Sequence, residues 1–159
     1  VMLKLSGQEP DLPHGEVYLS DLPWTYAANG RGVVERDLNA GQQADHDGHA
    51  LKLGGAAYAK GLGTYGASLI RYRLGRSCSR LRAEVGVDDD AGAAGSVIFR
   101  VIGDGAVLFD SALLKGGARA GVDVDLTGVR ELKLSVDVGG DGDDNDLADW
   151  ADARLTCEP

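Results

Sequence analysis

Alternation of apolar and polar side chains with a period of two is the feature of this sequence that most restricts its fold. The clearest runs are residues 68–74, 80–87 and 131–138. A strand points successive side chains to opposite faces, so such runs predict antiparallel sheets with one buried face. No stretch keeps a 3.6-residue apolar period over three helical turns, and the sequence therefore predicts an all-β protein.

Strand candidates recur at short intervals along the chain. They are Val17–Leu19, Gly32–Arg36, Leu51–Leu53, Ser68–Leu74, Arg80–Val87, Ser96–Ile102, Ala106–Asp110, Val122–Leu126, Glu131–Val138 and Trp150–Cys157. Glycine, at 24 of 159 residues, supplies turns between them. One such turn, Gly103-Asp104-Gly105, predicts a hairpin. About ten short antiparallel strands favour a jelly-roll β-sandwich.

The first 15 residues differ from the rest in composition. A short strand, Val1–Leu5, is followed by a segment with two prolines, Gly, Ser and Asp, which is typical of linkers. We therefore expect residues 1–15 to be the end of a preceding domain with a linker. Residues 16–159 are expected to form one β-sandwich module.

The charge of the chain is acidic, with 25 Asp and Glu against 16 Lys and Arg and a net charge of −9. Nucleic acids and anionic membrane surfaces attract basic proteins, so neither is expected as a partner. No nucleophile elbow and no glycine-rich phosphate loop occurs in the sequence. The many carboxylates lie in turns, and none is marked for burial as the pair in a glycosidase is, which favours a non-catalytic protein.

Two loops carry residues that could bind a metal. The stretch 46–49 has a histidine at each end, and the stretch 141–152 is rich in Asp and Asn, which are hard oxygen ligands. Solvated loops are the alternative for both stretches, and the second does not match the EF-hand pattern because it lacks Glu at the twelfth position.

Cys78 and Cys157 each lie beside a predicted strand. They either form one disulfide between an internal strand and the last strand, which implies an oxidising compartment, or are two unrelated thiols. No cysteine and histidine spacing indicates zinc.

Aromatic residues are few. Trp24 and Tyr26 fall in a predicted loop, where an exposed ring can stack on the apolar face of a pyranose while Asp, Asn or Arg binds the hydroxyls. The alternative for Trp24 is packing into one end of the sandwich. Trp150 precedes an alternating strand and is predicted to lie in the core.

Five segments together resemble a known family. They are Tyr18–Leu22, Gly61–Ser68, Val85–Asp89, Ser96–Gly105 and Ala148–Leu155. In order and spacing they are similar to the NPCBM domain, the novel putative carbohydrate-binding module, grouped as carbohydrate-binding module family 51. The resemblance implies a jelly-roll module of a secreted bacterial glycoside hydrolase, a galactose-containing glycan as partner and a structural calcium ion. Residues 1–5 are also similar to the closing strand of family 27 α-galactosidase-like enzymes.

The chain departs from this family at three positions. The family often has His where Tyr65 and Leu147 stand, and Trp where Arg31 stands. These departures put retention of galactose binding, or its specificity, in question. The candidate sugar-binding residues are Trp24, Tyr26, Arg31, Tyr65, Asn145 and Asp146. The candidate calcium ligands are Asp21 and Asp149, with Asp152 as the alternate.

Three functions stay open at this point. The first is a non-catalytic module that targets an appended glycoside hydrolase to galactose-containing glycans. The second is a structural spacer of the hydrolase that has lost sugar binding, which the replaced histidines favour. The third, an enzyme in its own right, has the weakest support. The sequence leaves the exact sugar and linkage, the parent reaction and the oligomeric state undetermined.

Overall fold

The computed structural model describes residues 12–41, 46–139 and 146–158. The strands there are β1 (Gly15–Tyr18), β2 (Tyr26–Ala28), β3 (Glu35–Arg36), β4 (Leu51–Leu53), β5 (Ala56–Tyr58), β6 (Gly61–Tyr65), β7 (Ser68–Arg73), β8 (Cys78–Val87), β9 (Ser96–Gly103), β10 (Ala106–Lys115), β11 (Arg119–Asp125), β12 (Glu131–Val138) and β13 (Leu147–Cys157). Two 3-10 helices, η1 (Leu19–Asp21) and η2 (Asp89–Ala91), complete the list. None of the helices in this part of the chain has the length and hydropathy to span a membrane.

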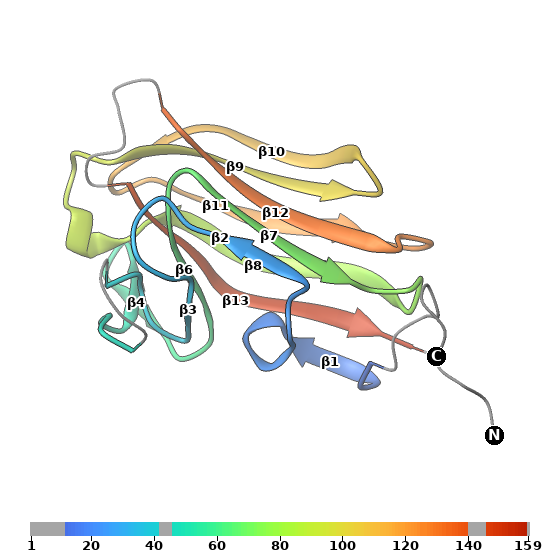
Figure 1. The fold of residues 1–159 in the computed structure, drawn as a ribbon. Helices are drawn as coiled ribbons and strands as arrows, with labels where there is room; N and C mark the ends of the chain where they lie inside the picture. The colour runs from blue at the N-terminus through green and yellow to red at the C-terminus, as the bar shows by residue number, and fades with distance from the viewer. Residues whose placement is uncertain (1–11, 42–45, 140–145, 159) are drawn as a thin grey trace.

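The strands form two packed antiparallel sheets, as predicted for an all-β sandwich (Figure 1). The six-stranded sheet has the order β11-β8-β13-β6-β3, and β1 pairs with the C-terminal half of β13. The five-stranded sheet has the order β10-β9-β12-β7-β2. A small hairpin of β4 and β5 is separate from both sheets.

The core lies between the two sheets and follows the alternation seen in the sequence. In β12 the buried residues are Leu132, Leu134 and Val136, which alternate with partly exposed neighbours. Trp150 of β13 is fully buried and meets the ring of Phe99 edge to face at 5.1 Å between centroids. The prediction that Trp150 lies in the core is confirmed.

The described residues contain thirteen strands, where the sequence predicted about ten. The missed strands, β2, β5 and β6, are short and rich in Ala and Gly, and Thr64 of β6 is the one β-branched residue among them. All five residues of β6 are buried, which removes the alternation as well. The predicted hairpin at Gly103-Asp104-Gly105 is present and joins β9 to β10.

A disulfide joins Cys78, the first residue of β8, to Cys157, the last residue of β13. The two residues are cross-strand partners in the six-stranded sheet. Of the two alternatives left by the sequence, the structure has the one in which the two cysteines are paired. The bond fastens the C-terminal strand to the middle of the chain.

Several connections between the two sheets lie at one end of the sandwich, which we call the loop end. It comprises the segments that follow β2, β6, β8, β10 and β12, each of which crosses from one sheet to the other. The described parts of these segments are residues 29–34, 66–67, 88–95, 116–118, 139 and 146. Strand β1 begins and β13 ends near the opposite end of the molecule (Figure 1).

Candidate functional site

Asn29 organises one side of the loop end. Its side-chain oxygen accepts a hydrogen bond from the Tyr65 amide at 2.7 Å, and its side-chain nitrogen donates to the carbonyl of Arg31 at 2.7 Å. The backbone amide of Gly30 donates to the carbonyl of Tyr65 at 2.9 Å. These bonds attach the segment after β2 to the end of β6.

Close backbone approach explains the glycine at position 30. A Cβ atom there would lie 2.2 Å from the carbonyl oxygen of Gly66, which no real Cβ tolerates. The amide of Gly66 in turn donates to the carbonyl of Asp146 at 3.0 Å. The segments after β2, after β6 and before β13 are therefore fixed to one another through their backbones.

Arg31, Tyr65 and Asp146 of the predicted sugar set come together here. The guanidinium of Arg31 lies over the ring of Tyr65, 4.9 Å from its centroid. Asp146 is buried and accepts a hydrogen bond from the Ser96 amide at 3.0 Å. Asn145 falls outside the described residues.

Tyr65 is only 1% exposed, so its ring has no face available for a sugar. It is the direct cross-strand partner of Leu147. The two positions at which the family often has histidine are therefore neighbours, and here both carry packing side chains. Of the three positions at which the chain departs from the family, 31, 65 and 147, only Arg31 is exposed to solvent.

Trp24 and Tyr26 lie away from this group. Trp24 is partly buried at the edge of the sandwich, with Arg36 stacked 3.8 Å from its ring centroid. Tyr26 is 45% exposed on the outer face of the five-stranded sheet, beside Arg71. Tyr26 begins β2 rather than lying in the predicted loop.

A hydrogen-bonding pocket of about 230 Å³ opens beside Leu147, and we call it the polar pocket. It is lined by Asn39, Ala40, Gly41, Asp47, Gly48, His49, Asp90 and Leu147. Because Leu147 also pairs with Tyr65, the pocket adjoins the Arg31 and Tyr65 contact at the loop end.

Asp90 is the centre of the polar pocket. One of its oxygens lies 2.9 Å from Nδ1 of His49 and accepts a hydrogen bond from the Asn39 amide group at 2.8 Å. Contact with His49 and then with Asn39 lowers the pKa of Asp90, so the carboxylate stays ionised. The His49 side chain is 82% exposed, which leaves its outer edge available to a ligand.

The segment that carries Asn39 crosses the outer face of the six-stranded sheet at Gly63. Asp149 of β13 lies between its cross-strand partners Gly63 and Gly86. A Cβ at Gly63 would lie 2.1 Å from the carbonyl oxygen of Leu38, because the chain crosses directly above. The glycines therefore let the covering segment approach and bury Asp149.

Asp149 has no exposed surface, and neither of its carboxylate oxygens has a hydrogen-bond partner. Burial raises the pKa of Asp149 well above its usual value, and the neighbouring Asp88 carboxylate raises it further. Asp88 is also fully buried and accepts hydrogen bonds from Asn39 and from the Lys52 amide. Two adjacent buried carboxylates are the donor set that a hard cation prefers.

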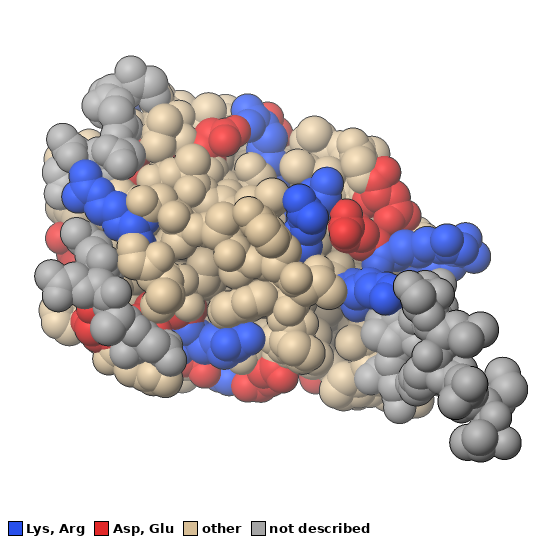
Figure 2. Space-filling model, in the orientation of Figure 1, with Lys and Arg blue, Asp and Glu red and all other residues tan. Residues whose placement is uncertain are grey.

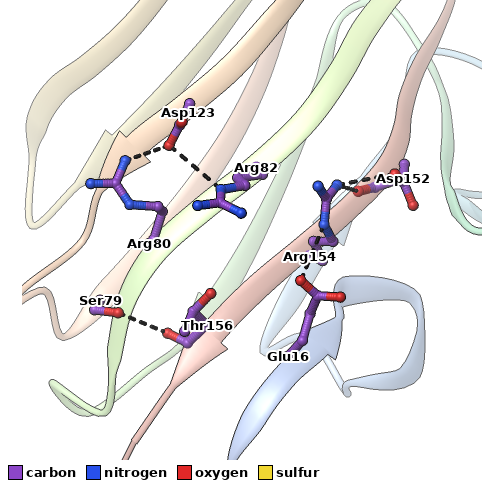
Figure 3. Close-up of polar contacts among 8 residues, drawn as sticks. All are labelled: Glu16, Ser79, Arg80, Arg82, Asp123, Asp152, Arg154 and Thr156. Carbon is purple, nitrogen blue, oxygen red and sulfur yellow. Dashed lines mark hydrogen bonds and ion pairs between the residues drawn. The ribbon is translucent and has the colours of Figure 1, made fainter.

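The three predicted calcium ligands do not gather as a metal site. Asp21 pairs with Lys60 at 2.8 Å, and Asp152 pairs with Arg154 at 3.0 Å (Figure 3). Each of these carboxylates already has a cationic partner on the surface. Within the described ranges, no group of three or more His, Cys, Asp or Glu residues is arranged to hold a metal ion.

Sequence reasoning missed the residues that build the polar pocket. It noted the stretch 46–49 only as a possible metal loop, and it did not single out Asn39 or Asp90. Asp90 is 41 residues from His49 and 51 residues from Asn39 in the chain. Only an alignment or the fold itself could reveal that they share one pocket.

The polar pocket offers groups that can recognise hydroxyls. A glycosidase needs one carboxyl with a raised pKa to act as the general acid. Among the described carboxyls with a resolved shift, only Asp149 has a raised pKa, and it is buried away from solvent. The exposed imidazole and carboxylate groups of the polar pocket can exchange hydrogen bonds with the hydroxyls of a neutral ligand.

Comparison with known proteins decides the family. Residues 15–156 match the family model of the NPCBM/NEW2 domain. The chain belongs to this family. The resemblance inferred from the five sequence segments is therefore confirmed, and the NPCBM module is a carbohydrate-binding, non-catalytic type of domain.

Solved structures of family 51 carbohydrate-binding modules (CBM51) share this fold. One is the CBM51 from Clostridium perfringens GH95 in complex with methyl-galactose, with a TM-score of 0.81 and 35% identity over 89% of this chain and 99% of that chain. Another holds CBM51-2 in complex with GlcNAc and the INT domains of Clostridium perfringens ZmpB. Its TM-score is 0.79, with 32% identity over 88% of this chain and 31% of that chain.

A curated relative places such a module within a much longer protein. The Renibacterium salmoninarum protein named "Putative endo-alpha-N-acetylgalactosaminidase" is 43% identical over 150 residues. The match covers 93% of this chain but only 10% of that protein. The NPCBM module thus spans about a tenth of the length of this relative.

Proposed function

We propose that this NPCBM module binds galactose-containing glycans at the loop end and so holds an appended glycoside hydrolase at its substrate. The observation that carries the proposal is the polar pocket, where the side chains of His49 and Asp90 are exposed and the buried Asn39 amide holds Asp90 in place. The methyl-galactose complex of a 35% identical CBM51 supports galactose as the sugar.

A carboxylate and an imidazole side by side can bind a pair of neighbouring hydroxyls. The carboxylate accepts hydrogen bonds from the hydroxyls, while a ring nitrogen donates or accepts in a fixed direction. The pocket of about 230 Å³ is shallow and open, so affinity is expected to be micromolar to millimolar, roughly −4 to −8 kcal/mol. Linkage to an enzyme turns such weak binding into a high local concentration.

Calorimetric titration with methyl-β-galactoside and lactose tests this function. The expected result is saturable binding that weakens about tenfold or more in His49→Ala and Asp90→Asn, since each removes a hydroxyl partner. Asp123→Asn, a change of an exposed carboxylate on another face, is the matched control and should bind normally. Absence of heat at millimolar sugar would contradict galactose binding and leave the spacer function.

We also propose that the module carries a structural calcium ion held by Asp149 and Asp88. The support is the buried pair of carboxylates, of which Asp149 has no hydrogen-bond partner. Calcium takes six to eight oxygens, so carbonyls and water would supply the others. When bound, the ion would neutralise the two charges and stabilise the folded state.

Thermal unfolding in calcium and in EDTA tests the ion. Calcium is expected to raise Tm of the natural module, and this increase should disappear in Asp149→Asn. Asp152→Asn is the control and should retain the increase. A Tm that does not change with calcium would exclude the ion.

Secretion of the module is proposed as well, since the disulfide between Cys78 and Cys157 suits an oxidising compartment.

A further inference from the structure

A second pocket lies at the edge of the sandwich, and we call it the edge pocket. Its volume is about 450 Å³, within the range of small-molecule sites. It is lined by Leu12, Pro13, Asp21, Leu22, Pro23, Trp24, Thr25, Tyr72, Arg73 and Leu74. It shares no lining residue with the polar pocket.

Trp24 gives the edge pocket an aromatic wall. Its indole is partly buried against the core, and the guanidinium of Arg36 lies 3.8 Å from the ring centroid on one face. The stacked arginine fixes the plane of the ring and increases its apolar contact area. A ring held in this way at the wall of a cavity is a rigid stacking surface.

Polar groups surround this apolar wall. The Arg73 side chain is exposed and has no hydrogen-bond or ion-pair partner among the residues that the structure describes, while Asp21 is held by Lys60 at 2.8 Å. The Thr25 hydroxyl donates to the carbonyl of Arg71 at 3.2 Å and keeps its lone pairs for another donor. Guanidinium, carboxylate and hydroxyl groups at a rim can bind the hydroxyls of a ligand.

We infer that the edge pocket is a second saccharide-binding site, which takes one pyranose ring against Trp24. A pyranose is amphipathic, since its C–H groups form an apolar face and its hydroxyls project around the edge. The pocket has the complementary distribution, with Trp24, Leu22 and Leu74 inside and Asp21, Thr25 and Arg73 around them. A module with two sites binds a branched or repeated glycan with greater avidity than one with a single site.

The wall of the site is preorganised. The Tyr72 hydroxyl donates to the carbonyl of Leu19 at 3.1 Å, and this fully buried bond ties β7 to η1. The Thr25 amide donates to the carbonyl of Arg71 at 2.8 Å. Both sides of the pocket are therefore fixed to the same strand, so a ligand does not have to order them.

Nuclear magnetic resonance titration of the 15N-labelled module tests the second site. The chain has two tryptophans, and Trp150 is fully buried, so the two indole N–H signals report on the edge pocket and on the core. With methyl-β-galactoside, lactose or N-acetylglucosamine, the Trp24 indole and the Thr25 and Arg73 amides are expected to shift saturably. The Trp150 indole should stay unchanged.

Substitutions separate this site from the polar pocket. Arg73→Ala, an exposed change that should not affect folding, is expected to weaken binding at the edge pocket about threefold to tenfold, and Trp24→Ala more strongly. Tyr26→Ala removes an exposed aromatic outside the pocket and is the matched control. His49→Ala should leave the Trp24 response intact.

Two results would overturn the second site. One is a Trp24 indole that does not move with any of the three sugars. The other is a response that disappears in His49→Ala, because the signal would then report on one site at the loop end. If the Trp24 indole shifts but the loop-end amides do not respond, the result would contradict the proposed function and support the edge pocket as a site.

Discussion

Trp150 shows how much one residue contributes to this sandwich. It is the largest fully buried side chain and lies against Phe99 of the opposite sheet. Its cross-strand partners are Leu62 and Val85, which are also fully buried. One ring therefore contacts residues of both sheets at the centre of the core.

Trp150→Ala is expected to lower the free energy of unfolding by about 3–5 kcal/mol, because it leaves a large cavity that the sheets cannot fill. Urea unfolding followed by circular dichroism would measure the change. Trp24→Ala, at the partly exposed edge, is the matched control and should cost much less. Equal losses at the two positions would contradict the assignment of Trp150 to the centre of the core.

Asp104 is a second residue whose role the structure defines. It occupies the turn between β9 and β10 with a φ of 49°, a left-handed conformation that Asp and Asn tolerate. Its carboxylate accepts hydrogen bonds from the amides of Glu131 and Arg130, and these lower its pKa. A lowered pKa means that the ionised form stabilises the folded state.

Asp104→Asn should therefore be less stable than the natural module at neutral pH. The contribution is present above the unfolded pKa of about 3.9 and is lost as pH falls through the lower folded value. The difference in Tm between the two proteins is expected to shrink below about pH 3. A difference that stays constant from pH 7 to about pH 2.5 would contradict a role for the charge.

Among the elements, β13 determines how the chain closes. It pairs with β8 along one side and with β6 and β1 along the other. The disulfide between Cys78 and Cys157 links residues 79 positions apart at the end of the β8 and β13 pair. Cross-linking over so long a loop restricts the unfolded chain strongly.

The double change of Cys78 and Cys157 to Ser is expected to cost about 2–5 kcal/mol of stability. The same loss should appear when the natural module is reduced with dithiothreitol, which gives an independent measurement. Sugar binding at the loop end should persist in the folded fraction, because the disulfide lies at the opposite end of β13. Unchanged stability after reduction would contradict this contribution.

For the whole molecule, charge is spread rather than concentrated. Figure 2 shows the outer face of the five-stranded sheet as largely uncharged at its centre, with acidic and basic side chains next to one another around it. Arg100, for example, pairs with both Asp110 and Asp137. With a net charge of −9, no large basic surface is expected to attract a polyanion.

The affinity for a neutral galactoside should therefore change less than about twofold between roughly 0.05 and 0.5 M NaCl, since no counterions are released. Calorimetry at several salt concentrations would measure it. Heparin, a polyanion, serves as the control ligand and should not bind. A steep loss of affinity with salt would show that recognition is electrostatic.

The sequence alone was sufficient for the fold class, because alternation of apolar and polar residues depends only on neighbours in the chain. The buried sets in β8 and β12 and the Gly103–Gly105 hairpin are of this kind. The five family segments were likewise sufficient for the family. The three short strands rich in Ala and Gly could not be predicted, since pairing with neighbouring strands determines them.

The site depended on contacts between distant parts of the chain. The polar pocket joins Asn39, His49 and Asp90, and the edge pocket joins Trp24 to Arg73, over separations that no local pattern encodes. Burial of Tyr65 and the pairing of Asp88 with Asp149 arise only when β6, β8 and β13 lie side by side. Local patterning determined which residues face the core, and tertiary packing decided which polar groups meet one another.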